Sequence, residues 1–182
     1  MVVAGSLAAC GAADPGVPLA PGITLKLPSA AQLGREVEAV QRITARYNDQ
    51  SFAFESRISV TATRLLMVGT DGFGRRAITV EWSDLGMHVE TASFFPSVLP
   101  ATNIVADIML VHWPAQVLRA QLGPADTQLD ERTTSRRILN DGQLLIEITH
   151  SAGLAASWSG TWRLTNRARG YTIDIQSVEL AP

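Results

Sequence analysis

Apolar and polar residues alternate along most of the chain, and this period of two is the pattern of β-strands that bury one face. Within residues 51–60, Phe52, Phe54, Ile58 and Val60 share one face, while charged and hydroxyl side chains share the other. The same pattern, or a short apolar run beside a turn, recurs at residues 65–69, 78–82, 87–91, 136–139, 144–149, 158–164 and 171–175. One-sided alternation in so many segments predicts an antiparallel sheet with one face in water.

The middle of the chain has a helical period instead. Its apolar positions are Ile104, Ile108, Met109, Leu118 and Leu122. Pro114 interrupts this run, so we predict one helix that ends near His112 and a second short helix with Pro114 near its first turn. Residues 35–47 fit either a helix or a first strand. The predicted order is sheet, helix pair, sheet, and we expect the helix pair to cover the apolar face of a curved sheet.

The first residues are uncharged and end in Leu7-Ala8-Ala9-Cys10, which resembles the lipobox of bacterial lipoproteins. That resemblance implies cleavage before Cys10 and acylation of Cys10. Residues 1–9 would then be a signal peptide truncated at its start, since they lack a basic segment. The alternative is an ordinary buried cysteine in an N-terminal strand.

The residues that follow Cys10 contain three prolines within a short span and show no period. We therefore expect residues 10–28 to be a lipidated flexible tether and residues 29–182 to be the folded domain.

Composition narrows the class of protein. A chain of 182 residues with 46% hydrophobic and 18% charged residues fits one folded domain. The net charge of -2 argues against nucleic-acid binding. A lone cysteine cannot form an internal disulfide, and no apolar run reaches the roughly 18 residues that a transmembrane helix needs.

The sequence contains only weak signals for catalytic residues. His112 fits a packing or capping role, and His150 precedes a serine at a strand end with no aspartate nearby. The Gly-x-Ser-x-Gly motif is absent. Asp126, Asp130 and Glu131 form an acidic run that is typical of a solvated surface rather than of a metal site. We therefore expect no catalytic residue, no metal site and no cofactor.

Several local sequences resemble LolB, the outer-membrane lipoprotein receptor, and the wider LolA/LolB fold. Gly72-Phe73-Gly74 looks like the turn of that family, and residues 113–124 look like its Pro-Leu-x-x-Leu-x-x-Trp-x-x-Gly-x-Pro segment, with Gln121 in the place of the tryptophan. Residues 105–114 nearly match the Leu-x-Asp-x-x-Leu-x-x-Trp-Pro pattern of LolB-like lipoproteins encoded beside fatty-acid and aryl-polyene synthesis genes.

The resemblance implies an α+β fold in which an antiparallel, unclosed half-barrel sheet wraps over a short helix pair and encloses an apolar cavity. It further implies a lipoprotein on the periplasmic face of the outer membrane that binds acyl chains or a lipid-linked product and helps to deliver it, with a periplasmic carrier protein as a candidate partner. Gly11, the residue after the acylated cysteine, favours the outer membrane. The alternatives are a non-catalytic scaffolding lipoprotein and, more distantly, an acyl-ester hydrolase.

Two sets of site residues follow. From the periodicity we expect a cavity lined by Phe54, Ile58, Val80, Trp82, Met109, Leu118, Ile146 and Trp162. Phe73 lies in a tight turn among charged neighbours, so we expect an exposed ring; the alternative is a ring packed over the sheet edge. The resemblance implies that Phe73 contacts the membrane, because the matching turn of LolB carries an exposed leucine.

Overall fold

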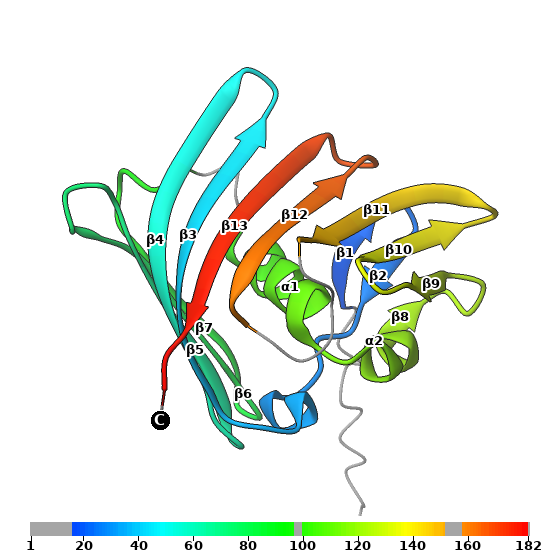
Figure 1. Cartoon of the computed structure of the whole chain (residues 1–182), viewed down its shortest axis with the longest axis horizontal. Coiled ribbons are helices and arrows are strands. Elements are labelled where there is room, and N and C mark those ends of the chain that lie inside the picture. The colour runs from blue at the N-terminus through cyan, green and yellow to red at the C-terminus, as the bar shows by residue number, and fades with distance from the viewer. Residues whose placement is uncertain (1–15, 97–99, 152–157, 182) are drawn as a thin grey trace, which may run out of the picture.

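The computed structural model describes residues 16–96, 100–151 and 158–181. Its main feature is a sheet of ten strands in the order β7-β6-β5-β4-β3-β13-β12-β11-β10-β9, in which every neighbouring pair is antiparallel. The strands are β3 (Val37–Tyr47), β4 (Gln50–Val60), β5 (Arg64–Thr70), β6 (Arg76–Ser83), β7 (Gly86–Thr91), β9 (Gln128–Glu131), β10 (Ser135–Asn140), β11 (Gln143–His150), β12 (Gly160–Asn166) and β13 (Tyr171–Glu179). The sheet curves without closing, because β7 and β9 remain its two edges (Figure 1). The predicted α+β half-barrel is confirmed.

The helices lie where the helical period placed them. Helix α1 (Ala101–His112) runs through the concave side of the sheet, and α2 (Ala115–Gln121) follows after Pro114 (Figure 1). Eight residues of α1 are buried, and Trp113, which follows the helix, is fully buried and donates its indole N–H to the Ser29 carbonyl at 3.3 Å. Among the described residues, no helix is both long and apolar enough to cross a membrane.

The segment 35–47, which the sequence left open between helix and strand, forms β3 at the centre of the sheet. Its buried, inward positions alternate with exposed or half-buried ones, and they include Gln41 and two alanines as well as Val37 and Ile43. The polar and small residues on this inward face weakened the period-two signal. The Asn140-Asp141-Gly142 turn joins β10 to β11, and both Asp141 and Gly142 have a positive φ as a tight hairpin turn requires.

The tether predicted for residues 10–28 is wrong in its described part. β1 (Val17–Ala20) and β2 (Ile23–Leu25) pair with each other and with β8 (Leu122–Gly123) in a second, three-stranded sheet. Leu19 and Leu25 are fully buried, so burial of apolar surface holds this segment in place. Pro18 is tolerated because β1 is an edge strand.

This second sheet also corrects the expectation that the helix pair alone covers the concave face. Helix α1 contacts β1, β6 and β12, whereas α2 contacts β9 near the edge of the large sheet. The core is therefore continuous from the N-terminal strands through α1 to the half-barrel. Residues 17–25 belong to the folded domain.

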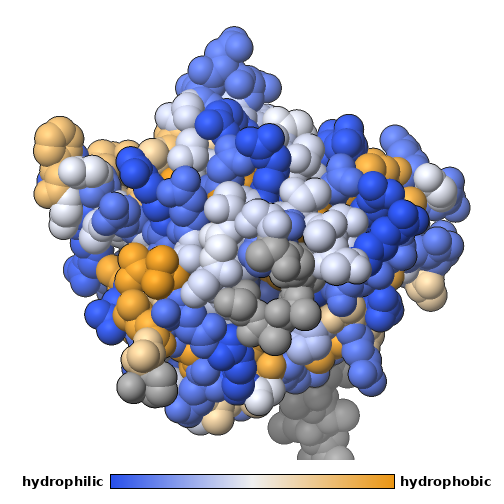
Figure 2. Space-filling view, viewed as in Figure 1, coloured by the Kyte–Doolittle hydropathy of each residue, from blue (hydrophilic) through white to orange (hydrophobic). Residues whose placement is uncertain are grey.

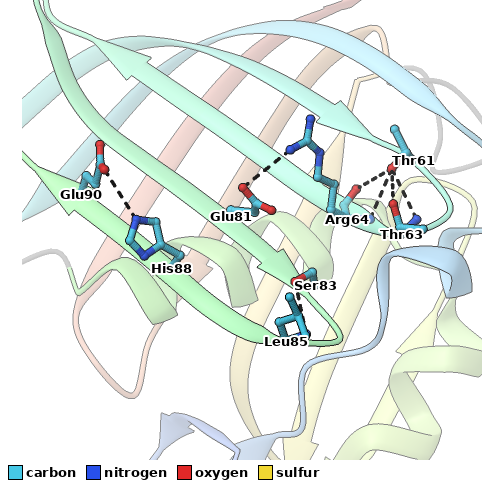
Figure 3. Close-up of polar contacts among 8 residues, drawn as sticks. All are labelled: Thr61, Thr63, Arg64, Glu81, Ser83, Leu85, His88 and Glu90. Atoms are coloured by element: carbon cyan, nitrogen blue, oxygen red, sulfur yellow. Dashed lines mark hydrogen bonds and ion pairs between the residues drawn. The ribbon is translucent and has the colours of Figure 1, made fainter.

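Ion pairs lie on the edge strand β7 and on the two strands beside it (Figure 3). His88 lies 3.5 Å from Glu90 on β7, and Arg64 on β5 lies 3.7 Å from Glu81 on β6. Charged side chains at a sheet edge disfavour pairing with another chain. The turn that joins β6 to β7 carries the fully exposed Leu85, whose backbone N–H donates to Ser83 Oγ at 3.3 Å.

Candidate ligand-binding cavity

A cavity of about 370 Å³ lies between α1 and the central strands of the sheet. This volume falls within the range of roughly 300–1,000 Å³ that is typical of ligand pockets. Most of its lining is apolar, with a few polar groups among apolar and aromatic side chains. The lining residues are Gln41, Ile43, Ala45, Tyr47, Phe54, Pro100, Asn103, Ile104, Asp107, Ile108, Arg169, Tyr171, Ile173 and Ile175.

The periods of the helix and of the strands select these residues. On α1 the lining positions are one turn apart, so they share the helix face that looks toward β3 and β13. On β3 the odd-numbered positions from 41 to 47 face the cavity, and on β13 those from 171 to 175 do so. Ala45 leaves space where a larger side chain would reach the helix.

The cavity has a solvent-exposed mouth and a buried floor. Tyr47, Tyr171 and Ile173 are half-buried at one end, whereas Gln41 and Ile175 are buried at the other. From Tyr47 to Gln41 the chain advances six residues along β3, or roughly 20 Å at about 3.3 Å per residue. The cavity therefore has the shape and polarity to take one extended apolar chain.

A buried carboxyl group lies on the α1 side of the cavity. Both oxygens of Asp107 accept from the Tyr171 hydroxyl, at 2.9 and 3.0 Å, and Asn166 donates to the same hydroxyl at 3.3 Å. Burial raises the pKa of Asp107 to about 7, although the Tyr171 hydrogen bond and the charge of Arg169 lower it in part. Burial also raises the pKa of Tyr171, so this hydroxyl keeps its proton and remains a donor.

Arg169 brings a positive charge to the mouth. It is half-buried, and it makes no ion pair with any residue in the described part of the chain. Its backbone N–H donates to Asn166 Oδ1 at 2.9 Å, which fixes the turn between β12 and β13. The guanidinium can therefore contact an anionic group of a ligand.

The floor is built around Gln41, whose Nε2 donates to His112 Nε2 at 3.0 Å and to Ser177 Oγ at 3.3 Å. The His112 ring stacks on Trp158 at 3.8 Å between centroids. Burial, together with the nearby positive charge of Arg136, lowers the pKa of His112 to about 3. His112 is therefore a neutral, packed side chain that accepts the hydrogen bond.

Of the eight side chains predicted to line a cavity, Phe54 lines this one. Trp82 is half-buried and donates its indole N–H to the Pro28 carbonyl at 2.8 Å. The other six are buried elsewhere in the continuous core: Ile58, Val80, Met109, Leu118, Ile146 and Trp162. The strand and helix periods identified their inward direction, but these six side chains are packed within the continuous core instead of bordering the cavity.

The sequence did not lead us to expect the polar groups of the cavity, Asp107, Tyr171 and Arg169. A signal for one of them exists in the sequence, because Asp107 interrupts an otherwise apolar helix between Ile104 and Val111. A carboxyl group in such a position needs a partner, and the partner could not be read from the sequence. Tyr171 and Arg169 lie more than 60 residues further along the chain and reach Asp107 only through the fold.

Phe73 is 87% exposed, as predicted. Its turn is held by Asp71, whose Oδ1 accepts from the backbone N–H of Phe73 at 3.0 Å and of Arg75 at 2.9 Å. The Arg75 guanidinium lies 5.6 Å from the Phe73 ring centroid and 4.4 Å from that of Phe94, which is 45% exposed. The turn between β5 and β6 projects at the left of Figure 1, where Figure 2 shows an apolar projection.

Cys10, the predicted lipid attachment site, and the predicted signal peptide lie outside the described residues. The acidic run predicted to be a solvated surface is split in the structure. Asp126 is exposed, whereas Glu131 on β9 forms an ion pair with the buried Arg136.

Fold and cavity together define an α+β half-barrel protein with an internal, ligand-sized apolar cavity. The chain belongs to the family described as "Protein of unknown function (DUF3261)", whose model matches residues 38–179. No curated protein matches the sequence significantly. The crystal structure of a LolA superfamily protein from Nitrosomonas europaea is similar at 8% identity and a TM-score of 0.44, over 84% of this chain and 89% of that chain.

Proposed function

We propose that this protein is a non-catalytic lipoprotein that binds one acyl chain, or a lipid-linked product, in its cavity and helps to deliver it to the outer membrane. An acyl group on Cys10 would hold the domain at the periplasmic face of that membrane. The observation that carries the proposal is the apolar cavity between α1 and strands β3, β4 and β13, with the half-buried cation Arg169 at its mouth. A filled interior would have favoured the scaffolding alternative.

The energetics suit a carrier. Each methylene moved from water into the cavity contributes about 0.8 kcal/mol, so a long acyl chain gains on the order of 10 kcal/mol relative to water. A bilayer offers the same chain a comparable apolar environment, so the free energy of transfer between protein and membrane is small. In the bound state, a carboxylate or phosphate head would lie beside Arg169, which is half-buried at the mouth.

Filling the cavity should abolish binding. Ile173 lines the cavity and is half-buried, so Ile173→Trp places an indole in the path of the acyl chain on a strand that accepts aromatic residues. We expect the affinity for palmitate to fall at least about tenfold, measured by displacement of an apolar fluorescent probe. Equal affinity in the variant and in the wild type would contradict binding in this cavity.

The matched control is Val178→Trp. Val178 lies on the same strand and is 60% exposed on the outer face of the sheet, so the indole there should leave probe binding unchanged. Circular dichroism of both variants tests whether each keeps the fold.

Delivery should depend on Phe73. An exposed ring beside Arg75 and Arg76 can enter the membrane interface while the guanidinium groups meet anionic headgroups. Phe73→Glu should leave palmitate binding intact and slow the transfer of bound lipid to vesicles with anionic lipids several-fold. Leu85→Glu is the control, since Leu85 is at least as exposed as Phe73 but lies in the turn at the other end of β6. Equal slowing by both substitutions would mean that added charge, and not the Phe73 turn, determines the rate.

A further inference from the structure

The inward residues of β3 and β13 form four layers between the mouth of the cavity and its floor. The strand register pairs them as Tyr47 with Tyr171, Ala45 with Ile173, Ile43 with Ile175 and Gln41 with Ser177. The first pair is half-buried, whereas the residues of the last pair are 1% and 4% exposed. The first three layers carry aromatic or aliphatic side chains, and the fourth carries only polar ones. The chemistry of the cavity therefore changes at its deepest layer.

The cavity ends at this fourth layer. Gln41 lines it, but its partner Ser177 does not, and neither does Ala39, the next inward residue of β3. On α1 the last lining residue is Ile108, so the cavity stops before His112 at the end of that helix. Within the part of the chain that the structure describes, Gln41 is thus the side chain that closes the deep end.

Gln41 is held in place from two sides. Its Nε2 donates to His112 Nε2 at 3.0 Å and to Ser177 Oγ at 3.3 Å. The His112 ring is itself fixed, because it stacks on Trp158 and contacts Trp162 edge-on at 5.0 Å between ring centroids. An acyl chain that pushed past Gln41 would break both hydrogen bonds and leave buried polar groups without partners. The deep end of the cavity is therefore a firm stop.

The distance from the mouth to this stop corresponds to a chain length. Tyr47 and Gln41 are six residues apart on β3, or roughly 20 Å at about 3.3 Å per residue. An extended chain advances about 1.2 Å per bond, since one residue spans roughly 3.3–3.6 Å over three bonds. Roughly 16 carbon–carbon bonds therefore fit between the mouth and Gln41.

We infer that Gln41 sets the upper limit of acyl-chain length, so that the cavity takes saturated chains of up to about 16 carbons and leaves the surplus of a longer chain outside. The inference rests on the proposed function, since it assumes that the head of the ligand stays at the mouth beside Arg169. Each methylene added within the limit is buried and should tighten binding about fourfold. A methylene added beyond the limit stays in water and should add almost nothing.

Displacement of the apolar fluorescent probe by a series of saturated acids tests the limit. The series runs from decanoate through laurate, myristate, palmitate and stearate to icosanoate. For the wild type the affinity should rise steeply up to palmitate and should change less than about twofold between palmitate and icosanoate. An affinity that keeps rising at the same rate through icosanoate would overturn the inference and leave the proposed function standing. If no acid in the series displaces the probe, the proposed function fails and the inference fails with it.

Two substitutions should move the limit in opposite directions. Gln41→Ala removes the side chain that closes the deep end, so this variant should bind stearate about tenfold more tightly than palmitate. Ile43→Phe places a ring in the third layer, so its affinities should level off at laurate or myristate. Because Ile43→Phe leaves the hydrogen bonds of Gln41 in place, it keeps the inference testable if Gln41→Ala does not fold. A limit at palmitate in every folded variant would overturn the inference.

The matched controls make the same changes on the outer face of the same two strands. Gln176→Ala lies on β13 next to Ser177, and Val40→Phe lies on β3 next to Gln41. Both positions are exposed, so neither substitution reaches the cavity, and both variants should keep the limit at palmitate. A limit that moves equally in Gln176→Ala and in Gln41→Ala would contradict the role of Gln41.

Discussion

At pH 8 the Asp107→Asn variant should be more stable than the wild type by on the order of 2–4 kcal/mol, while at pH 4 the two proteins should differ by less than about 1 kcal/mol. The carboxyl group is buried against α1 and the cavity, and burial raises its pKa to about 7. An unfolded aspartate has a pKa near 3.9, so the two states differ by about three units, each worth about 1.36 kcal/mol.

The direction follows from proton binding. Below about pH 4 the group is protonated in both states, and the native fold carries no penalty. Between about pH 4 and 7 the folded protein keeps the proton that the unfolded chain has lost, so wild-type stability falls as the pH rises through this window. Asparagine has nearly the same shape and does not ionise, so the variant should not show this decline.

Urea unfolding at pH 4, 6 and 8 measures the effect. Tyr171→Phe is a second variant to measure, because it removes the hydroxyl that donates to the two Asp107 oxygens at 2.9 and 3.0 Å. That variant should raise the pKa of Asp107 further and should lose more stability at pH 8 than at pH 4. A wild type whose stability is independent of pH between 4 and 8 would contradict the raised pKa of Asp107.

Secondary structure was largely predictable because one face of the sheet is exposed to solvent, so that polar and apolar residues alternate along its strands. Alternation such as that of Phe54 and Ile58 against Glu55 and Arg57 needs only local information. The Asn140-Asp141-Gly142 hairpin and the helix break at Pro114 are likewise local. The prediction of secondary structure failed where the strands are very short. β1 and β2 span four and three residues, and the prolines and glycines around them conceal the alternation of buried positions.

The cavity was predictable in kind but not in its residues. Periodicity showed that Met109 and Ile146 face inward, yet both are packed in the core. Which inward residues border an empty space depends on where α1 lies above the sheet, and that placement is set by long-range packing against β1 and β12. Exposure of Phe73 was different, because the Asp71 turn that excludes its ring from the core is contained in five consecutive residues.

Membrane attachment should depend on Cys10. We expect Cys10→Ser, introduced at the native chromosomal locus, to move the protein from the membrane fraction to the soluble fraction and to abolish incorporation of an acyl label. Leu7-Ala8-Ala9-Cys10 resembles a lipobox, and a multiply acylated N-terminus holds a protein firmly in a bilayer whereas one chain anchors it only marginally.

If Cys10 is acylated, the fold makes the anchor short. β1 begins at Val17, so six residues separate it from Cys10, and even a fully extended segment of that length spans only about 20 Å. An acylated Cys10 would therefore keep the domain close to the bilayer surface, where release of an acyl chain from the cavity would take place. Gly11→Ala, which keeps the cysteine, should stay with the membrane and serves as the control. Retention of Cys10→Ser in the membrane fraction, with no acyl label on the wild type, would refute the lipoprotein proposal and leave binding in the cavity to be judged by Ile173→Trp.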